Sequence, residues 1–187
     1  VYGSAKITGP VSEKLVDITR CESPYTASKI AGEAMIYSYS NVYRLNAAIV
    51  RLSNVFGRYD DSNRVVPMWI RNALSGEPLL LFGPQKELDL TYLDDAVDGI
   101  YKLIEKFDSI HGVPINLSYG SKESLLSVAK MIIQMTNSRS QLNFENSRLG
   151  ELWVYQADLS RAKSLLGYSP KFDITTGLKL TVDWYIN

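Results

Sequence analysis

The sequence predicts an α/β fold in which short buried strands alternate with amphipathic helices. Its 187 residues are 45% hydrophobic and 21% charged, which suffices for one sizeable core or two small ones. Short apolar runs rich in β-branched residues alternate with longer segments whose apolar residues recur at helical spacing. No internal repeat or low-complexity stretch interrupts this order.

The first predicted helix begins at "SPYTASK", residues 23–29. Ser23 is suited to cap a helix, and Pro24 fits the first helical position because its missing N–H has no partner there. Small and apolar residues continue to about Tyr43 without a proline, so we expect several turns. Tyr25 and Lys29, four residues apart, then share one face.

The spacing of this pair permits acid/base chemistry. A free tyrosine hydroxyl ionises near pH ~10, and an ammonium group within a few ångströms favours the phenolate. Tyr25 beside Lys29 is therefore a candidate proton acceptor. The alternative is an ordinary surface contact in which the lysine stem lies on the ring, and the spacing alone favours that reading.

The remaining elements follow from local signals. A strand is predicted at 47–55, and its carboxyl end at 52–57 would point at a ligand crevice. A helix is predicted in the segment 67–76, with Pro67 near its start and Gly76 just past its end. Asp94 is a candidate cap for the helix that follows it. The other predicted elements are strands at 78–82 and 115–118, a turn at 83–88, and helices at 125–135, 158–166 (stopped by Gly167) and 178–185.

Composition narrows the function. Twenty basic and twenty acidic residues give zero formal net charge, so no basic field favours nucleic acid or an anionic membrane. One cysteine, Cys21, excludes an internal disulfide, and one histidine, His111, leaves too few ligands for a zinc cluster. No apolar run approaches the roughly 20 residues of a membrane span. We therefore expect a protein that acts on a small molecule and uses no metal site.

An ordered set of motifs carries a family resemblance. "VYG" (1–3), "SPYTASK", "RLSNVFGRYD" (51–60), "ELDLTYLDDAVDGI" (87–100), "RLGE" (148–151) and "DLSRAKSLLGYSP" (158–170) occur in turn. Each is weak singly, but together they make the chain resemble the extended short-chain dehydrogenase/reductase family. This family contains the NAD-dependent nucleotide-sugar epimerases and dehydratases typified by UDP-galactose 4-epimerase. The resemblance covers essentially the whole chain.

The resemblance implies roles for five residues. Tyr25 is the catalytic acid/base, and Lys29 is its electrostatic partner; both also contact the nicotinamide end of NAD, with NADP left open. Asn54 and Arg148 contact the diphosphate of a nucleotide-sugar substrate, and Glu151 binds its ribose hydroxyls. From the residues alone, Asn54 equally suits a turn cap, and "RLGE" an exposed ion pair.

The resemblance also implies an arrangement of domains. Residues 1–53 correspond to the trailing part of a Rossmann dinucleotide-binding domain, and 54–187 to the smaller substrate-binding domain, with about 94–118 returning to the Rossmann side. Family members carry the Gly-rich phosphate-binding turn before "VYG", and this sequence contains none. We therefore expect a C-terminal portion that alone neither binds NAD tightly nor turns over substrate. The complete protein is expected to be a cytoplasmic homodimer.

One departure limits the choice of substrate. Leu88 stands where many nucleotide-sugar enzymes have an arginine, so either Lys86 or Arg58 compensates or the substrate differs. The residues that separate epimerases from dehydratases lie upstream of "VYG". A reductase or dehydrogenase of a non-nucleotide carbonyl compound, or a non-catalytic binding module on the same fold, are the alternatives. The retained Tyr25 and Lys29 argue against the module.

Overall fold

The structure is a computed structural model that describes residues 9–13, 18, 21, 23–147 and 152–187. It confirms the predicted α/β class. In chain order the elements are α1 (Pro24–Tyr43), β1 (Ile49–Leu52), β2 (Asn54–Phe56), α2 (Val65–Ser75), β3 (Leu79–Phe82), β4 (Glu87–Tyr92), α3 (Leu93–Glu105), α4 (Phe107–Ile110), β5 (Pro114–Leu117), β6 (Lys122–Ser124), α5 (Leu125–Met135), β7 (Leu142–Glu145), α6 (Ser160–Leu166) and α7 (Ile174–Ile186).

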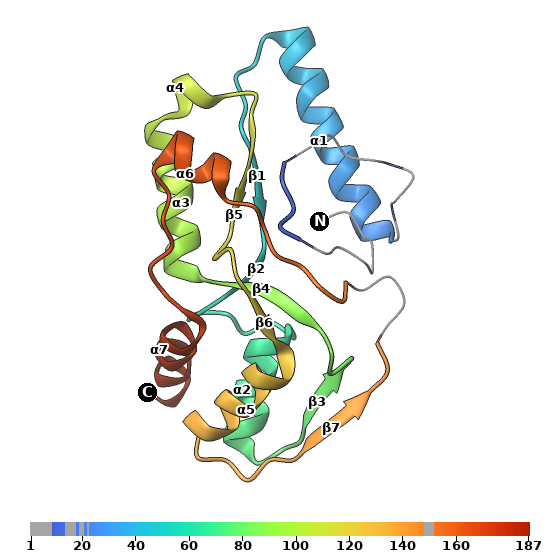
Figure 1. Cartoon of the computed structure of the whole chain (residues 1–187), viewed down its shortest axis with the longest axis vertical. Helices are drawn as coiled ribbons and strands as arrows, with labels where there is room; N and C mark the ends of the chain where they lie inside the picture. Colours follow the sequence, from blue (N-terminus) through green and yellow to red (C-terminus); the bar gives the residue numbers. More distant parts are fainter. Residues whose placement is uncertain (1–8, 14–17, 19–20, 22, 148–151) are drawn as a thin grey trace.

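A parallel pair of strands forms the centre of one half. β1 and β5 pair from Ile49 opposite Pro114 to Leu52 opposite Leu117. Figure 1 shows α1 on one side of this pair, with α3 and α6 on the other. The hydrophobic cluster on the α3 and α6 side contains Leu103, Ile110, Ile115, Leu117, Tyr155, Ala157, Leu159, Ala162, Leu166 and Tyr168. Residues 155–168, which the predicted division places in the substrate-binding part, share this cluster with α3 and β5, which it places on the Rossmann side. The division into domains stays a prediction.

The other half is built on two further sheets. β4 lies between β2, to which it is parallel, and β6, to which it is antiparallel, while β3 pairs with β7. Helices α2, α5 and α7 bury a second cluster against these strands. Trp69 on α2 is buried there, and its indole Nε1 donates to the Leu80 carbonyl at 2.9 Å.

The strand predicted at 47–55 is two strands in different sheets. β1 ends at Leu52 and β2 begins at Asn54, with Ser53 between them. The Ser53 hydroxyl donates to the Asp89 carbonyl and accepts from the Asn54 N–H at 2.6 Å. Since these bonds tie Ser53 to β4, the chain leaves one sheet and enters the next within a single residue. The sequence reading also missed β4, β6 and β7.

Helix ends test the local signals. Gly76 and Gly167 end α2 and α6 in the left-handed conformation, as predicted. Asp94 is not a cap: α3 starts at Leu93, and Asp94 pairs with Arg58 instead. The predicted start of the last helix is late by one turn, because Asp173 caps α7.

Membrane-spanning helices and clusters of metal ligands were both sought in the described part of the chain. No helix there is long and apolar enough to cross a bilayer. The same residues contain no group of three or more His, Cys, Asp or Glu side chains that could hold a metal ion.

Candidate active site

The first turn of α1 carries the predicted acid/base pair. The Ser23 hydroxyl accepts from the Thr26 N–H at 3.1 Å, and Pro24 occupies the first turn, so the predicted cap is confirmed. Tyr25 is 70% exposed, and the Lys29 Nζ lies 5.1 Å from the centre of its ring. Both side chains therefore sit on one accessible face of the helix. Their catalytic roles stay predictions.

Asn54 lies at the point where the chain changes sheets. It begins β2 opposite Leu90 of β4, and its side-chain Nδ2 donates to the Asp89 carbonyl at 3.4 Å. The side chain is exposed. The amide is thus held at the carboxyl end of β1, on the edge where parallel sheets bind ligands.

Asp89 joins β4 to two other segments beside Asn54. Its side chain is 0% exposed, and its carboxylate accepts from the backbone N–H groups of Tyr119 (3.2 Å), Gly120 (3.1 Å) and Ala157 (3.0 Å). Burial raises the pKa of Asp89 above its usual value, while hydrogen bonds from Ser118 and these N–H groups act in the opposite direction. Asp89 is therefore a structural acceptor that joins β4 to two loops.

The structure gives a physical account of Leu88. This side chain packs against both hydrophobic clusters, so it serves as an apolar link between the two halves. Of the cations that could compensate, Arg58 pairs with both oxygens of Asp94 (3.2 and 2.9 Å) and donates to the Tyr92 hydroxyl. Lys86 is only 4% exposed, and its stem lies against Gly83. Neither side chain extends freely into solvent.

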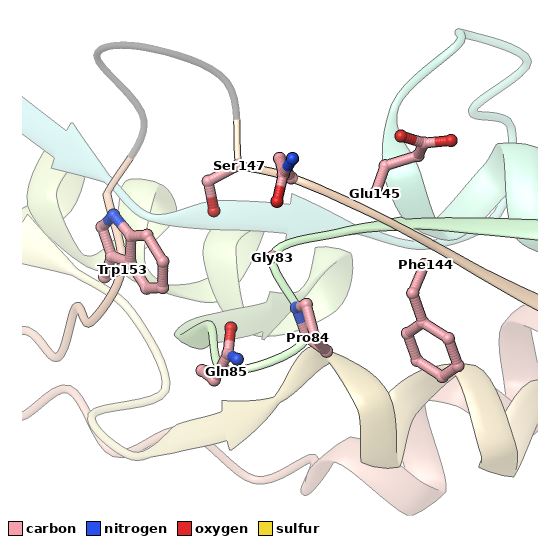
Figure 2. A pocket seen from close by; sticks show the side chains of 8 residues that line it. Gly83, Pro84, Gln85, Phe144, Glu145, Ser147 and Trp153 are labelled. Atoms are coloured by element: carbon pink, nitrogen blue, oxygen red, sulfur yellow. The ribbon is translucent and has the colours of Figure 1, made fainter.

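A cavity of about 350 Å³ opens between the turn after β3 and the end of β7. Figure 2 shows Trp153 and Phe144 at opposite ends of it, with Pro84 and Gln85 between them. Gly83 has φ of +70°, and a side chain there would collide with the Ser147 hydroxyl. That hydroxyl is buried and has no hydrogen-bond partner among the described residues. A cavity with aromatic ends and an unsatisfied donor suits a ligand with a flat ring and polar edges.

Two predicted substrate residues, Arg148 and Glu151, lie outside the described residues. Their convergence with Asn54 therefore stays a prediction. Sequence reasoning missed the cavity residues Gln85, Phe144 and Trp153, which come from three segments. The available signal was the position of Trp153 two residues after "RLGE", beside a predicted diphosphate site.

Comparisons with known proteins agree with the motifs. Residues 1–118 match the profile of the NAD dependent epimerase/dehydratase family. A dTDP-glucose 4,6-dehydratase of Xanthomonas campestris pv. campestris (strain B100) is 28% identical over 197 residues, covering 100% of this chain and 55% of the relative. A UDP-glucuronate 4-epimerase of Thermodesulfobacterium geofontis (strain OPF15) is 30% identical over 167 residues, covering 87% of this chain and 50% of the relative.

Solved structures are similar over nearly the whole chain. UDP-glucuronic acid 4-epimerase from Bacillus cereus, in complex with UDP-glucuronic acid and NAD, gives a TM-score of 0.91 at 31% identity and covers 98% of this chain and 58% of that one. dTDP-glucose 4,6-dehydratase from Bacillus anthracis str. Ames, in complex with NAD, gives 0.89 at 26% identity, with 100% and 58% covered. The chain thus spans little more than half the length of these relatives.

Proposed function

Because the chain belongs to the NAD dependent epimerase/dehydratase family, we propose that it supplies the proton-transfer residues and the substrate side of a nucleotide-sugar epimerase or dehydratase. The observation that carries the proposal is the Lys29 ammonium, 5.1 Å from the centre of the Tyr25 ring, at the start of a capped helix. A scaffold has no use for this pair, whereas sugar oxidation needs a base at the hydroxyl that is oxidised.

The residues of α1 fit the nicotinamide end of NAD. Tyr25 and Lys29 are both exposed on one face, so the N–H donors of Lys29 would hold the nicotinamide ribose beside the phenol. When bound, NAD supplies the hydride acceptor for a sugar carbon. The Tyr25 oxygen takes the proton of the hydroxyl on that carbon, and the positive charge of Lys29 stabilises the phenolate form that does so.

The substrate side combines Asn54, the cavity and the "RLGE" segment. In this proposal Asn54 and Arg148 contact the diphosphate, and Glu151 contacts the nucleotide ribose. The nucleobase of the substrate lies in the cavity between Trp153 and Phe144, where an aromatic face is available for stacking. The short sequence distance from Arg148 to Trp153 supports a single continuous nucleotide site.

Assembly and location form part of the same proposal. The outer face of α1 exposes several large apolar side chains, and such a surface favours a homodimer. These residues are Met35, Ile36, Tyr39, Val42 and Tyr43. A cytoplasmic location is compatible with a single cysteine, because the fold needs no oxidising compartment for a disulfide.

A product assay tests the proposal. The whole protein is incubated with NAD and with dTDP-glucose, UDP-glucose or UDP-glucuronic acid, and the products are separated and weighed. An epimerase gives a new sugar of unchanged mass, and a 4,6-dehydratase gives a keto sugar that has lost water. Tyr25→Phe and Lys29→Met are expected to lower the rate by about 10²- to 10⁴-fold, whereas the exposed control Tyr101→Phe on α3 retains it. Turnover that survives Tyr25→Phe would refute the assigned base.

A second candidate function rests on Leu88. Since this side chain packs into both clusters, the cation expected for a diphosphate is absent at that position. A reductase of a non-nucleotide carbonyl substrate would not need it. NADH oxidation with small aldehydes and ketones distinguishes the two: UDP and dTDP compete with a nucleotide-sugar substrate and leave a small-carbonyl reductase uninhibited.

A further inference from the structure

The C-terminal helix α7 holds the loop that joins β2 to α2, residues 57–64. The Tyr185 hydroxyl donates to the Asp60 carbonyl. The Trp184 ring meets the Tyr59 ring edge-on, with 5.2 Å between the ring centres. Two neighbouring aromatic residues of α7 therefore contact two neighbouring residues of the loop.

The helix is a firm support for this loop. Leu178 and Val182 of α7 are buried in the cluster that α2 and α5 share. Burial raises the pKa of Tyr185 above its ordinary value and the Arg71 guanidinium opposes this rise, so the hydroxyl remains a donor at neutral pH. Arg71 on α2 also donates from Nη2 to the Ser62 carbonyl at 2.8 Å. Side chains of both α2 and α7 thus hold the backbone of the loop.

The conformation that they hold is a costly one. Tyr59 has φ of +65°, in the left-handed region that few residues other than glycine adopt, and its side chain is 73% exposed. The Arg71 Nη1 is buried and has no hydrogen-bond partner among the described residues. Backbone strain of this kind persists where ligands are bound, and an unsatisfied buried donor also calls for an explanation. The loop is therefore a candidate ligand-binding segment.

The loop also lies where parallel strands bind ligands. β2 and β4 are parallel, with Phe56 opposite Tyr92 at their carboxyl ends, where the chain enters the loop. Asn54, the proposed diphosphate contact, stands three residues before the loop, which is about 10 Å along a strand. A nucleotide sugar, with its base, diphosphate and hexose, is long enough to contact both. The exposed side chains of the loop include Asn63 and Arg64, whose N–H groups suit the acceptor oxygens of such a ligand.

We propose that loop 57–64 is a substrate-binding segment and that Tyr185 is its positioning residue: the hydroxyl on α7 holds the loop in the conformation that receives the substrate. The inference rests on the proposed function, in which the substrate is a nucleotide sugar. Tyr185 does not touch the substrate in this scheme, and it acts only through the Asp60 carbonyl.

Limited proteolysis tests the hold on the loop and needs no turnover. Trypsin cuts after Arg58 and Arg64, and such a cut requires the segment to leave its folded conformation. Tyr185→Phe keeps the ring and removes the hydroxyl, so cleavage in the loop should become about 3- to 10-fold faster. Cleavage after Arg44, at the end of α1, is the internal reference and should not change. Tyr101→Phe, which removes an exposed hydroxyl on α3, is the matched control and should leave every rate unchanged.

Kinetics of the whole protein test the binding role. Tyr185→Phe should raise KM for the nucleotide sugar about 3- to 10-fold and change kcat by less than about 2-fold, because the proposed acid/base pair on α1 is untouched. Saturating UDP or dTDP should slow tryptic cleavage of the loop in the unaltered protein. Tyr101→Phe should change neither constant.

The outcomes separate this inference from the proposed function. Unchanged cleavage in Tyr185→Phe would show that α7 does not hold the loop. Faster cleavage with an unchanged KM, or a fall in kcat alone, would overturn the binding role while the nucleotide-sugar function stands. If the whole protein turns over no nucleotide sugar, the proposed function and the binding role both fail, although faster cleavage would still establish the hold of α7. Tyr59→Asn tolerates the left-handed conformation and loses the contact with Trp184, so it should also speed cleavage and is measured in parallel in case Tyr185→Phe does not fold.

Discussion

Removing the Asp89 carboxylate is expected to destabilise the junction between the two halves. In Asp89→Ala, the N–H groups of Gly120 and Ala157 lose their acceptor, whereas the Tyr119 N–H keeps a second acceptor, the Thr91 hydroxyl, at 3.1 Å. The Ala157 N–H is buried, so the loss of its acceptor costs about 2–3 kcal/mol, and the half-buried Gly120 N–H costs about 1 kcal/mol. The expected loss is therefore about 3–4 kcal/mol, a large part of the 5–15 kcal/mol that typically stabilises a domain.

Urea denaturation followed by far-ultraviolet circular dichroism measures this loss. With a typical slope of about 2 kcal/mol per molar, the midpoint should fall by about 1.5–2 M. Asp89→Asn keeps one acceptor oxygen and should lose about half as much free energy. Asp61→Ala removes an exposed carboxylate and should change stability by less than about 0.5 kcal/mol. A loss below about 1 kcal/mol in Asp89→Ala would refute the account of Asp89 as the central acceptor.

Further predictions test packing, capping and ligand binding. Gly177→Ala places a methyl group 2.9 Å from the Phe56 ring and should cost about 1–3 kcal/mol in urea unfolding, whereas Gly32→Ala, with open space around it, should stabilise the chain. Backbone and side-chain hydrogen bonds from Thr176 hold the pKa of Asp173 below its ordinary value of 3.8, so its cap stabilises the fold above that pH. The advantage in melting temperature over Asp173→Ala should disappear as the pH falls through the lowered pKa; an advantage that persists there would contradict this. Leu88→Arg should lower the free energy of unfolding by more than about 2 kcal/mol, because a guanidinium would enter the apolar contact, whereas Leu88→Met should cost less. Calorimetry should show no gain in UDP binding for Leu88→Arg. Calorimetric titration of this chain with NAD should show no micromolar binding, and such binding would reveal an unrecognised cofactor site.

The features predicted correctly depend on residues close together in the chain. The Ser23 cap and the glycine ends at 76 and 167 each involve bonds that span only a few residues. The Tyr25 and Lys29 pair needs only a continuous helix. Such signals can be read without knowing the tertiary structure.

The features that were missed depend on contacts between distant segments. β4 contains Glu87 and Asp89, which break the apolar pattern of a buried strand, and Asp89 is tolerated only because N–H groups 30 and 68 residues away satisfy it. In α3, apolar residues that recur at helical spacing are not the residues that the fold buries. Val97 and Ile104 are exposed, and the face with Gly99 packs on β5 instead.

The same distinction explains why the sequence predicts the Tyr25 and Lys29 pair but not the residues of the cavity. Proton transfer requires two side chains one turn apart, and a single helix supplies them. In the proposed nucleotide site, Asn54 stands at a change of sheet, Gln85 lies in a turn, and Phe144 and Trp153 line the cavity from two further segments. Because the cavity residues come together only through contacts between distant segments, a substitution such as Asp89→Ala should disturb the cavity while leaving the first turn of α1 intact. The two halves of the proposed site therefore differ in what maintains them: local capping holds the proposed acid/base pair, and tertiary hydrogen bonds hold the proposed substrate pocket.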